Sequence, residues 1–150
     1  MLDSMYPFWS FVISVVLAQV LKPFVAMLFT GKFSPRLIFA SGGMPSSHTA
    51  GVAGLCLSIG IRESFNSTSF AIALALAFIV AYDAANVRYY AGKNIQLTKQ
   101  IIEDLKLENE FILDEPIYFE RIKDVLGHKW SEVIAGAIFG LMIAFVLNIY

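Results

Sequence analysis

Long apolar stretches alternate with short polar ones along most of this 150-residue chain. Four of the apolar stretches approach the roughly 20 helical residues needed to cross a hydrocarbon core of about 30 Å. They cover residues 7–29, 46–61, 67–87 and 131–150. The second is the shortest and contains Gly51, Gly54 and Gly60, so we expect a helix buried among its neighbours rather than surrounded by lipid. The pattern predicts one domain, residues 1–150, folded as an all-α integral membrane bundle with about four membrane segments.

One long polar segment, at about residues 93–127, separates the third and fourth apolar stretches. Its first half has apolar residues at roughly helical spacing, namely Ile95, Leu97, Ile101, Ile102 and Leu105. We expect an amphipathic helix here, on the membrane surface or against the bundle. Asp114-Glu115-Pro116 should end it, and a second short helix from Ile117 should lead to Gly127.

Because successive segments cross the membrane in opposite directions, the polar residues between them divide between two sides. Four segment ends, near Thr30, Ser46, Arg88 and His128, fall on one side. Of the 11 Lys and Arg residues, only Arg62 lies on the other side and one lies inside the first segment, so nine accompany those four ends. The positive-inside rule then places this side in the cytoplasm, and we expect an integral protein of a bacterial-type cell membrane.

Composition narrows the class of protein further. Hydrophobic residues make up 57% of the chain, more than a soluble domain normally holds, which indicates lipid-facing surface. The net charge of -1 provides no basic surface for nucleic acid. Cys56 is the only cysteine, so neither an intramolecular disulfide nor a cysteine-based metal site is expected.

The stretch "GGMPSSHTAG" is unusually polar for its position before an apolar segment. Ser46, Ser47 and His48 would stand at a helix N-terminus, where hydroxyls, free N–H groups and the helix dipole favour a phosphate oxygen. Gly43 just before them permits a positive φ or a close approach of the backbone to a ligand. A simple N-cap explains the serines about equally well, but a cap does not require the imidazole.

A second histidine, His128, lies four residues before Glu132 at the start of the fourth segment. A carboxylate one helical turn away can hold an imidazole in one tautomer and raise its basicity, as a nucleophilic or proton-transferring histidine requires. The alternative is an interfacial histidine above a carboxylate that the helix dipole stabilises.

Several charged residues accompany these histidines on the same side of the membrane. Asp83 lies deep enough in the third segment to require a cationic or hydrogen-bonding partner. Lys22, Arg36 and Arg88 could together hold a dianion, although each is also compatible with an interfacial cation that extends to the headgroups. Two histidines, cations and helix-mouth serines on one face predict phosphoryl transfer, because they supply nucleophile, acid and charge stabilisation. The sequence has no evident carboxylate cluster for a divalent metal, so we expect a mechanism without a metal or other cofactor.

Three motifs, "GGMPSSHTA", "YDAANVR" and "LGHKWSEVIAG", resemble the divergent branch of the type-2 phosphatidic-acid phosphatase superfamily, which is related to acid phosphatases and vanadium-dependent haloperoxidases. The resemblance extends from about Gln19 to Gly140. It implies that His128 is the nucleophile, with Glu132 where the superfamily has Asp. It also implies that His48 is the general acid and that Ser46 or Ser47 binds phosphate, with Ser47 replacing the usual Gly.

The phosphate-binding cations match the superfamily less closely. Lys22 and Arg36 are the favoured pair for its first motif, although they are farther apart than the usual spacing. Arg88 is favoured as the third-motif arginine, although the polar segment separates it from the nucleophile, and Arg121 is the nearer competitor in sequence.

The resulting hypothesis is a membrane phosphatase that acts on a lipid phosphate, such as a phosphatidylglycerophosphate-, phosphatidate- or polyprenyl-phosphate-like molecule. The main alternative is a non-catalytic membrane protein that binds anionic lipid headgroups or organises partners. Haloperoxidase or transport activity is less well supported, and the pattern leaves a homo-oligomer open.

Overall fold

The computed structural model describes residues 5–107 and 127–149, in which every regular element is a helix. The five α-helices are α1 (Tyr6–Thr30), α2 (Ser47–Glu63), α3 (Thr68–Tyr82), α4 (Arg88–Leu107) and α5 (Trp130–Ile149). A short 3-10 helix, η2 (Pro35–Phe39), follows α1, and a π-helical turn, η3 (Asp83–Val87), joins α3 to α4. The predicted all-α class is confirmed for this part of the chain.

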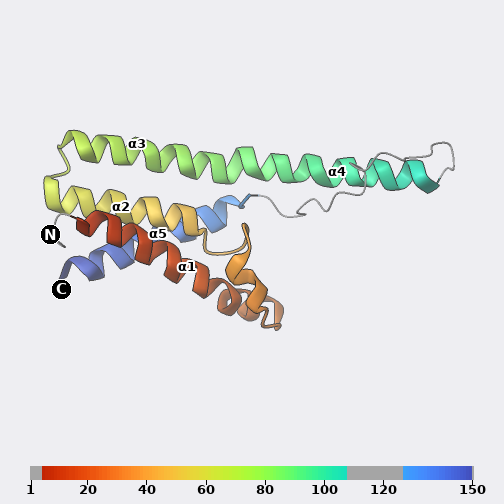
Figure 1. The fold of residues 1–150 in the computed structure, drawn as a ribbon, viewed down its shortest axis with the longest axis horizontal. Helices are drawn as coiled ribbons and strands as arrows, with labels where there is room; N and C mark the ends of the chain where they lie inside the picture. The colour runs from red at the N-terminus through yellow and green to blue at the C-terminus, as the bar shows by residue number, and fades with distance from the viewer. Residues whose placement is uncertain (1–4, 108–126, 150) are drawn as a thin grey trace.

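Helices α1, α2, α3 and α5 run back and forth along one axis (Figure 1). The two chain termini and the α2–α3 turn lie at one end of the bundle. The end of α1, the start of α2, the end of α3 and the start of α5 lie toward the other end, which we call the site end. This is the zigzag that the sequence predicts, and it brings together polar residues that are far apart in the chain.

Helix α2 lies at the centre and packs against α1, α3 and α5. Its N-cap is Ser46, whose Oγ accepts a hydrogen bond from the Thr49 N–H at 3.4 Å, so the predicted cap is present. Most of the helix is buried, and small residues allow close contact with its neighbours. At the α2–α5 contact a Cβ on Gly140 would collide with the Ala50 carbonyl, so only glycine fits there.

Within the described residues, three helices are long and apolar enough to cross a membrane: Tyr6–Thr30, the continuous helix Thr68–Leu105, and Trp130–Ile149. Large apolar side chains such as Ile72, Phe78 and Phe145 are exposed on their outer faces, as in a lipid-facing bundle. Helix α2, the second predicted membrane segment, has only 17 residues and is not among the three. Three candidate spans are therefore found where the sequence predicts about four segments.

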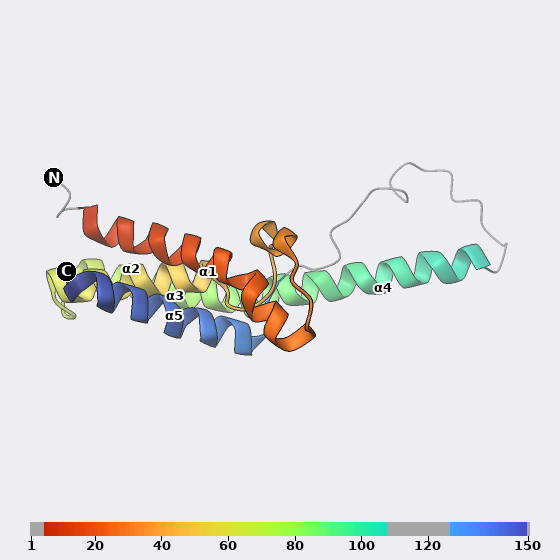
Figure 2. The same cartoon turned by 90° about the horizontal axis from the view of Figure 1, so that it is seen from below.

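Helix α4 covers the first part of the predicted polar insertion. It continues the line of α3 beyond the bundle instead of folding back, and its main contacts are with η3 (Figures 1 and 2). The prediction that it lies on the membrane surface or against the bundle is therefore not confirmed. The predicted break at 114–116 and the second short helix lie outside the described residues.

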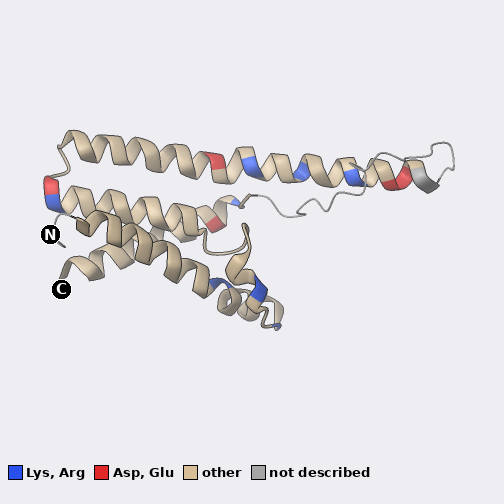
Figure 3. Cartoon of the chain, viewed as in Figure 1, with Lys and Arg blue, Asp and Glu red and all other residues tan. Residues whose placement is uncertain are grey.

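The described Lys and Arg residues are concentrated toward the site end and along α4 (Figure 3). At the opposite end of the bundle, the described charges are Arg62 and Glu63 at the end of α2. The asymmetry of charge that the sequence predicts is thus present in three dimensions.

Candidate functional site

A pocket of about 200 Å³ opens at the site end, between α2, α3 and the start of α5. His48, Asp83, Arg88 and His128 all line it, together with Ser41 from the loop before α2. Its remaining wall is apolar and consists of Ile79, Val80 and Ala84. Four predicted site residues that are up to 80 positions apart in sequence therefore share one cavity.

His128 is held at its backbone N–H and at Nδ1, whereas Nε2 has no partner among the described residues. The side chain is only 2% exposed, and its backbone N–H donates to the Ala84 carbonyl at 2.9 Å. Its Nδ1 lies 2.9 Å from Glu132 Oε2, and because a carboxylate only accepts, Nδ1 carries the proton. Nε2 then has a free lone pair, and it is buried without a partner among the described residues. A buried nitrogen lone pair that lines a cavity is available to a ligand or an electrophile.

The π-helical turn η3 explains how Asp83 and Arg88 reach the same pocket. In a regular α-helix, residues five apart point about 140° away from each other. The wider turn brings them together, and Arg88 Nε donates to Asp83 Oδ2 at 2.6 Å. Within the π-turn, the Arg88 backbone N–H donates to the Asp83 carbonyl, and the Ala84 carbonyl accepts from the backbone N–H of His128. Single π-turns inside α-helices occur frequently at functional sites, and this one links α3, α4 and α5.

The start of α5 packs closely against η3 and α4. Ala84 and Ala85 form a small buried cluster with Val133. Gly127, with φ of +88°, lies against the peptide between Arg88 and Tyr89. A Cβ at this glycine would stand 2.5 Å from Arg88 C and closer still to Tyr89 N. The position of His128 relative to Arg88 therefore depends on a residue without a side chain.

His48 stands in the first turn of α2 and has an exposed edge. Partial burial lowers its pKa, and the neighbouring Arg88, His128 and Lys22 lower it further, against a smaller opposite effect of Asp83. All of these groups lie near the imidazole, so a negatively charged ligand in the pocket would reverse the balance and favour its protonated form.

Ser46 and Ser47, the two serines of "GGMPSSHTA", are both buried and do not line this pocket. Ser46 Oγ is 3.0 Å from Thr49 Oγ1, and its backbone N–H donates to the Glu132 carbonyl at 3.0 Å. Ser46 thus connects α2 to the residue that holds His128. Gly43 has φ of +90°, one of the two uses that the sequence allows for it, and it lies near the Lys22 side chain.

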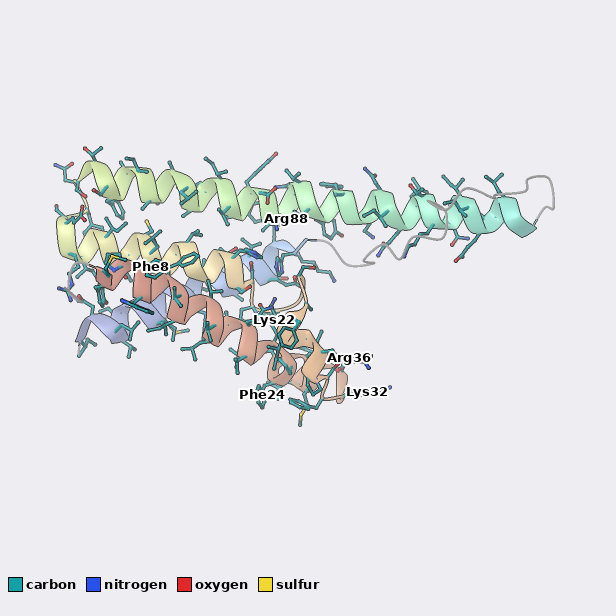
Figure 4. All side chains as sticks on the ribbon, viewed as in Figure 1. Phe8, Lys22, Phe24, Lys32, Arg36 and Arg88 are labelled. Carbon is teal, nitrogen blue, oxygen red and sulfur yellow. The ribbon has the colours of Figure 1, made fainter. Side chains whose placement is uncertain are left out.

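The two predicted cations from the first part of the chain differ in their placement. Lys22 is 2% exposed, and its Nζ donates to the Ala40 carbonyl at 3.1 Å, which also accepts from Gln19 Nε2 at 3.1 Å. Arg36 is exposed on η2 and does not line the pocket. Figure 4 shows it near Lys32, well away from Arg88. The structure therefore does not bring the expected three cations together, and Arg121 lies outside the described residues.

Sequence reasoning missed Ser41, Ala84 and the π-turn. Ser41 follows a short 3-10 helix whose path is not indicated by any periodic pattern. Ala84 acts through its backbone carbonyl, which no side-chain motif reveals. The run "DAANV" is compatible with an ordinary helix, so only the coordinates show the wider turn.

Comparison with known proteins supports this account of the motifs. A curated relative, described as an uncharacterized membrane protein, YuiD, of Bacillus subtilis (strain 168), is 29% identical over 147 residues, covering 95% of this chain and 93% of that protein. No solved structure matches the chain significantly. The model of the Divergent PAP2 family matches residues 4–143, which include both histidines and the π-turn, and the chain therefore belongs to that family.

Proposed function

We propose that this protein is a membrane phosphatase that hydrolyses a lipid phosphate through a phosphohistidine at His128, without a metal ion. The observation that carries the proposal is the state of His128: Nδ1 is held by Glu132, while Nε2 is buried, unpaired within the described residues and beside a pocket lined by His48 and Arg88. Membership of a family related to phosphatidic-acid phosphatases supports the same chemistry.

In the first step, the Nε2 lone pair of His128 attacks phosphorus and the phosphorus–oxygen bond to the lipid breaks. Protonated His48 donates its proton to the departing alkoxide, so the lipid alcohol leaves neutral. Glu132 stabilises the positive charge that develops on the His128 ring. Arg88 compensates the charge on the nonbridging phosphoryl oxygens, and buried Lys22 contributes a second positive charge nearby.

In the second step, a water molecule attacks the phosphorus of the phosphohistidine. Neutral His48 removes a proton from that water, the nitrogen–phosphorus bond breaks, and inorganic phosphate leaves. His48 is then protonated and His128 has its lone pair again, so the cycle closes without a net change in either residue.

The concentration of Lys and Arg at the site end favours a cytoplasmic site. A lipid phosphate made on that leaflet, such as a phosphatidylglycerophosphate-like intermediate, is the substrate that this orientation supports best.

The test is phosphate release in detergent and EDTA from phosphatidate, phosphatidylglycerophosphate and polyprenyl phosphate or diphosphate. We expect the wild type to hydrolyse at least one of these and His128→Ala to hydrolyse none. Acid quenching during turnover should trap phosphate on His128 in the wild type. Lys99→Ala, on the part of α4 beyond the bundle, is the control and should retain full activity.

If the wild type is no faster than His128→Ala on every substrate, the hydrolase proposal is wrong. Binding of vanadate without any phosphohistidine would then indicate a non-catalytic anion pocket. Activity that appears only when EDTA is left out would refute the metal-independent mechanism in particular.

A further inference from the structure

Ser41 is the one hydroxyl-bearing residue among the described residues that line the pocket at the site end. It comes from the loop between η2 and α2, whereas His48, Arg88 and His128 come from α2, α4 and the residues just before α5. A serine hydroxyl donates one hydrogen bond and carries no charge. The loop therefore brings a neutral donor to a pocket whose other side-chain donors are the histidines and Arg88.

The two serines of "GGMPSSHTA" are placed away from this pocket. Ser46 Oγ accepts from the Thr49 N–H at 3.4 Å and lies 3.0 Å from Thr49 Oγ1. Ser47 is only 5% exposed, and neither serine lines the pocket. The family resemblance implies that one of these two serines binds phosphate, but the structure places the hydroxyl-bearing Ser41 at the pocket instead.

The residue before Ser41 is held at both of its backbone polar groups. The Ala40 N–H donates to the Leu37 carbonyl at 3.1 Å, and the Ala40 carbonyl accepts from Gln19 Nε2 and from Lys22 Nζ, each at 3.1 Å. Gln19 and Lys22 stand about one turn apart on α1, so they share a face of that helix. Lys22 is 2% exposed, and burial of an ammonium group is costly unless it is hydrogen-bonded, so its contact with Ala40 is firmly kept. The two α1 side chains thus fix the point from which Ser41 enters the pocket.

We propose that the Ser41 hydroxyl donates a hydrogen bond to a nonbridging oxygen of the phosphoryl group in this pocket, and that Gln19 and Lys22 position it through the Ala40 carbonyl. This rests on the proposed function, to which it adds Ser41 as a binding residue and Gln19 as a positioning residue. Lys22 does not line the pocket, so it acts on the phosphoryl group through this loop as well as through its charge.

The first experiment measures binding of orthovanadate by calorimetry on protein in mild detergent. Ser41→Ala should weaken binding about tenfold to a hundredfold, because a hydrogen bond to a charged group contributes that much. Ser41→Thr keeps the hydroxyl and should restore most of the affinity. Ser34→Ala is the matched control, because Ser34 precedes η2 in the same connection between α1 and α2 and does not line the pocket.

Three results would overturn the proposal. The first is that Ser41→Ala binds vanadate as tightly as the wild type and Ser34→Ala do. The second is that Ser41→Thr loses as much affinity as Ser41→Ala, which would mean that the hydroxyl is not the group that matters. The third is that Ser47→Ala loses affinity and Ser41→Ala does not, which would return phosphate binding to the motif serine.

The positioning role is tested by Gln19→Met, which removes a neutral donor from the Ala40 carbonyl and changes no charge. It should weaken vanadate binding by about threefold to tenfold in the wild type, the effect of one neutral hydrogen bond. In the Ser41→Ala background it should have no further effect, because the group that it positions is absent. Equal losses in the two backgrounds would show that Gln19 acts on the site by another route and would overturn its role.

A structure of the wild type with tungstate gives a second measurement that does not depend on the folding of a variant. The tungsten is located by its anomalous scattering, and one tungstate oxygen should lie about 3 Å from Ser41 Oγ. Tungstate bound beside His128 with Ser41 out of hydrogen-bonding range would overturn the proposal.

Because neither vanadate nor tungstate is hydrolysed, the role of Ser41 and the phosphatase activity can fail separately. If Ser41→Ala loses vanadate affinity but the wild type hydrolyses no lipid phosphate, Ser41 remains an oxyanion-binding residue and the phosphatase proposal falls. If the wild type hydrolyses a lipid phosphate and Ser41→Ala changes neither KM nor vanadate affinity, the phosphatase stands and the role of Ser41 falls.

Discussion

Gly127 provides a direct test of how α5 is joined to the α3–α4 helix. Its φ of +88° is in the left-handed region, and the space where a Cβ would stand is already occupied by the peptide between Arg88 and Tyr89. The substitution Gly127→Ala therefore introduces two separate penalties, one from the backbone conformation and one from a collision with backbone atoms that cannot rotate away.

Gly31 separates these two penalties. It ends α1 with φ of +70°, and nothing lies within 4 Å of the position of its Cβ. Gly31→Ala should therefore cost only the left-handed conformation, about 1–2 kcal/mol. Gly127→Ala should cost this and a further ~1–3 kcal/mol of overpacking, because the start of α5 must move away from α4.

To measure the difference, both variants and the wild type are titrated with SDS in mild detergent. Their unfolding is monitored by circular dichroism. Orthovanadate binding provides a second readout, because moving α5 displaces His128 from Arg88. We expect Gly127→Ala to be the less stable variant and to bind vanadate more weakly, with Gly31→Ala binding as the wild type does. Equal stability and equal vanadate affinity in the two variants would refute the close packing of Gly127 on α4.

Three further predictions concern the pocket. Glu132→Gln should lower the rate of phosphate release by about 10²–10⁴-fold, while vanadate still binds. The reason is that an amide N–H directed at Nδ1 of His128 favours the tautomer in which Nε2 carries the proton and cannot attack. An unchanged rate would contradict the role of Glu132. Asp83→Asn should strengthen vanadate binding measured by calorimetry, because it removes a negative charge from the pocket and releases Arg88, whereas Arg88→Ala should weaken it. The surroundings of His48 lower its pKa, whereas a dianion bound in the pocket raises that pKa. Binding of tungstate should therefore be accompanied by uptake of a proton, and tungstate should bind more tightly as the pH falls from about 8 to about 6. His48→Gln should flatten this pH profile, and an unchanged profile would assign the proton to another group.

The main features of the fold follow from hydrophobic patterning. Apolar stretches of near-spanning length predict α1, α3 and α5, and Ser46 predicts the start of α2 through its capping hydroxyl. The alternation of direction then places His48 and His128 at one end without knowledge of any contact. Hydropathy can do this because whether a stretch is long and apolar enough to cross the hydrocarbon core is a local property of its sequence.

The details of the site depend on interactions that are not local. The π-turn places Ala84 and Ala85 against Val133 of another helix, and periodicity contains no signal for one extra residue in a turn. Arg36 is a second example, because the course of the loop after α1 determines its placement. The sequence therefore predicts which chemical groups lie at the site end more reliably than it predicts the orientation of each side chain.

The short length of α2 affects how deep the site lies in the bundle. Its 17 residues extend about 25 Å, less than the ~30 Å hydrocarbon core, whereas α1 and the α3–α4 helix are both longer. Lys22 is eight residues before the end of α1, so that helix continues about 12 Å past it toward the site end. The histidine at the start of α2 is thus recessed among helices that extend beyond it. A pocket recessed in this way lies close to the apolar part of the membrane, so the shortness of α2 favours the lipid-borne substrate that we propose.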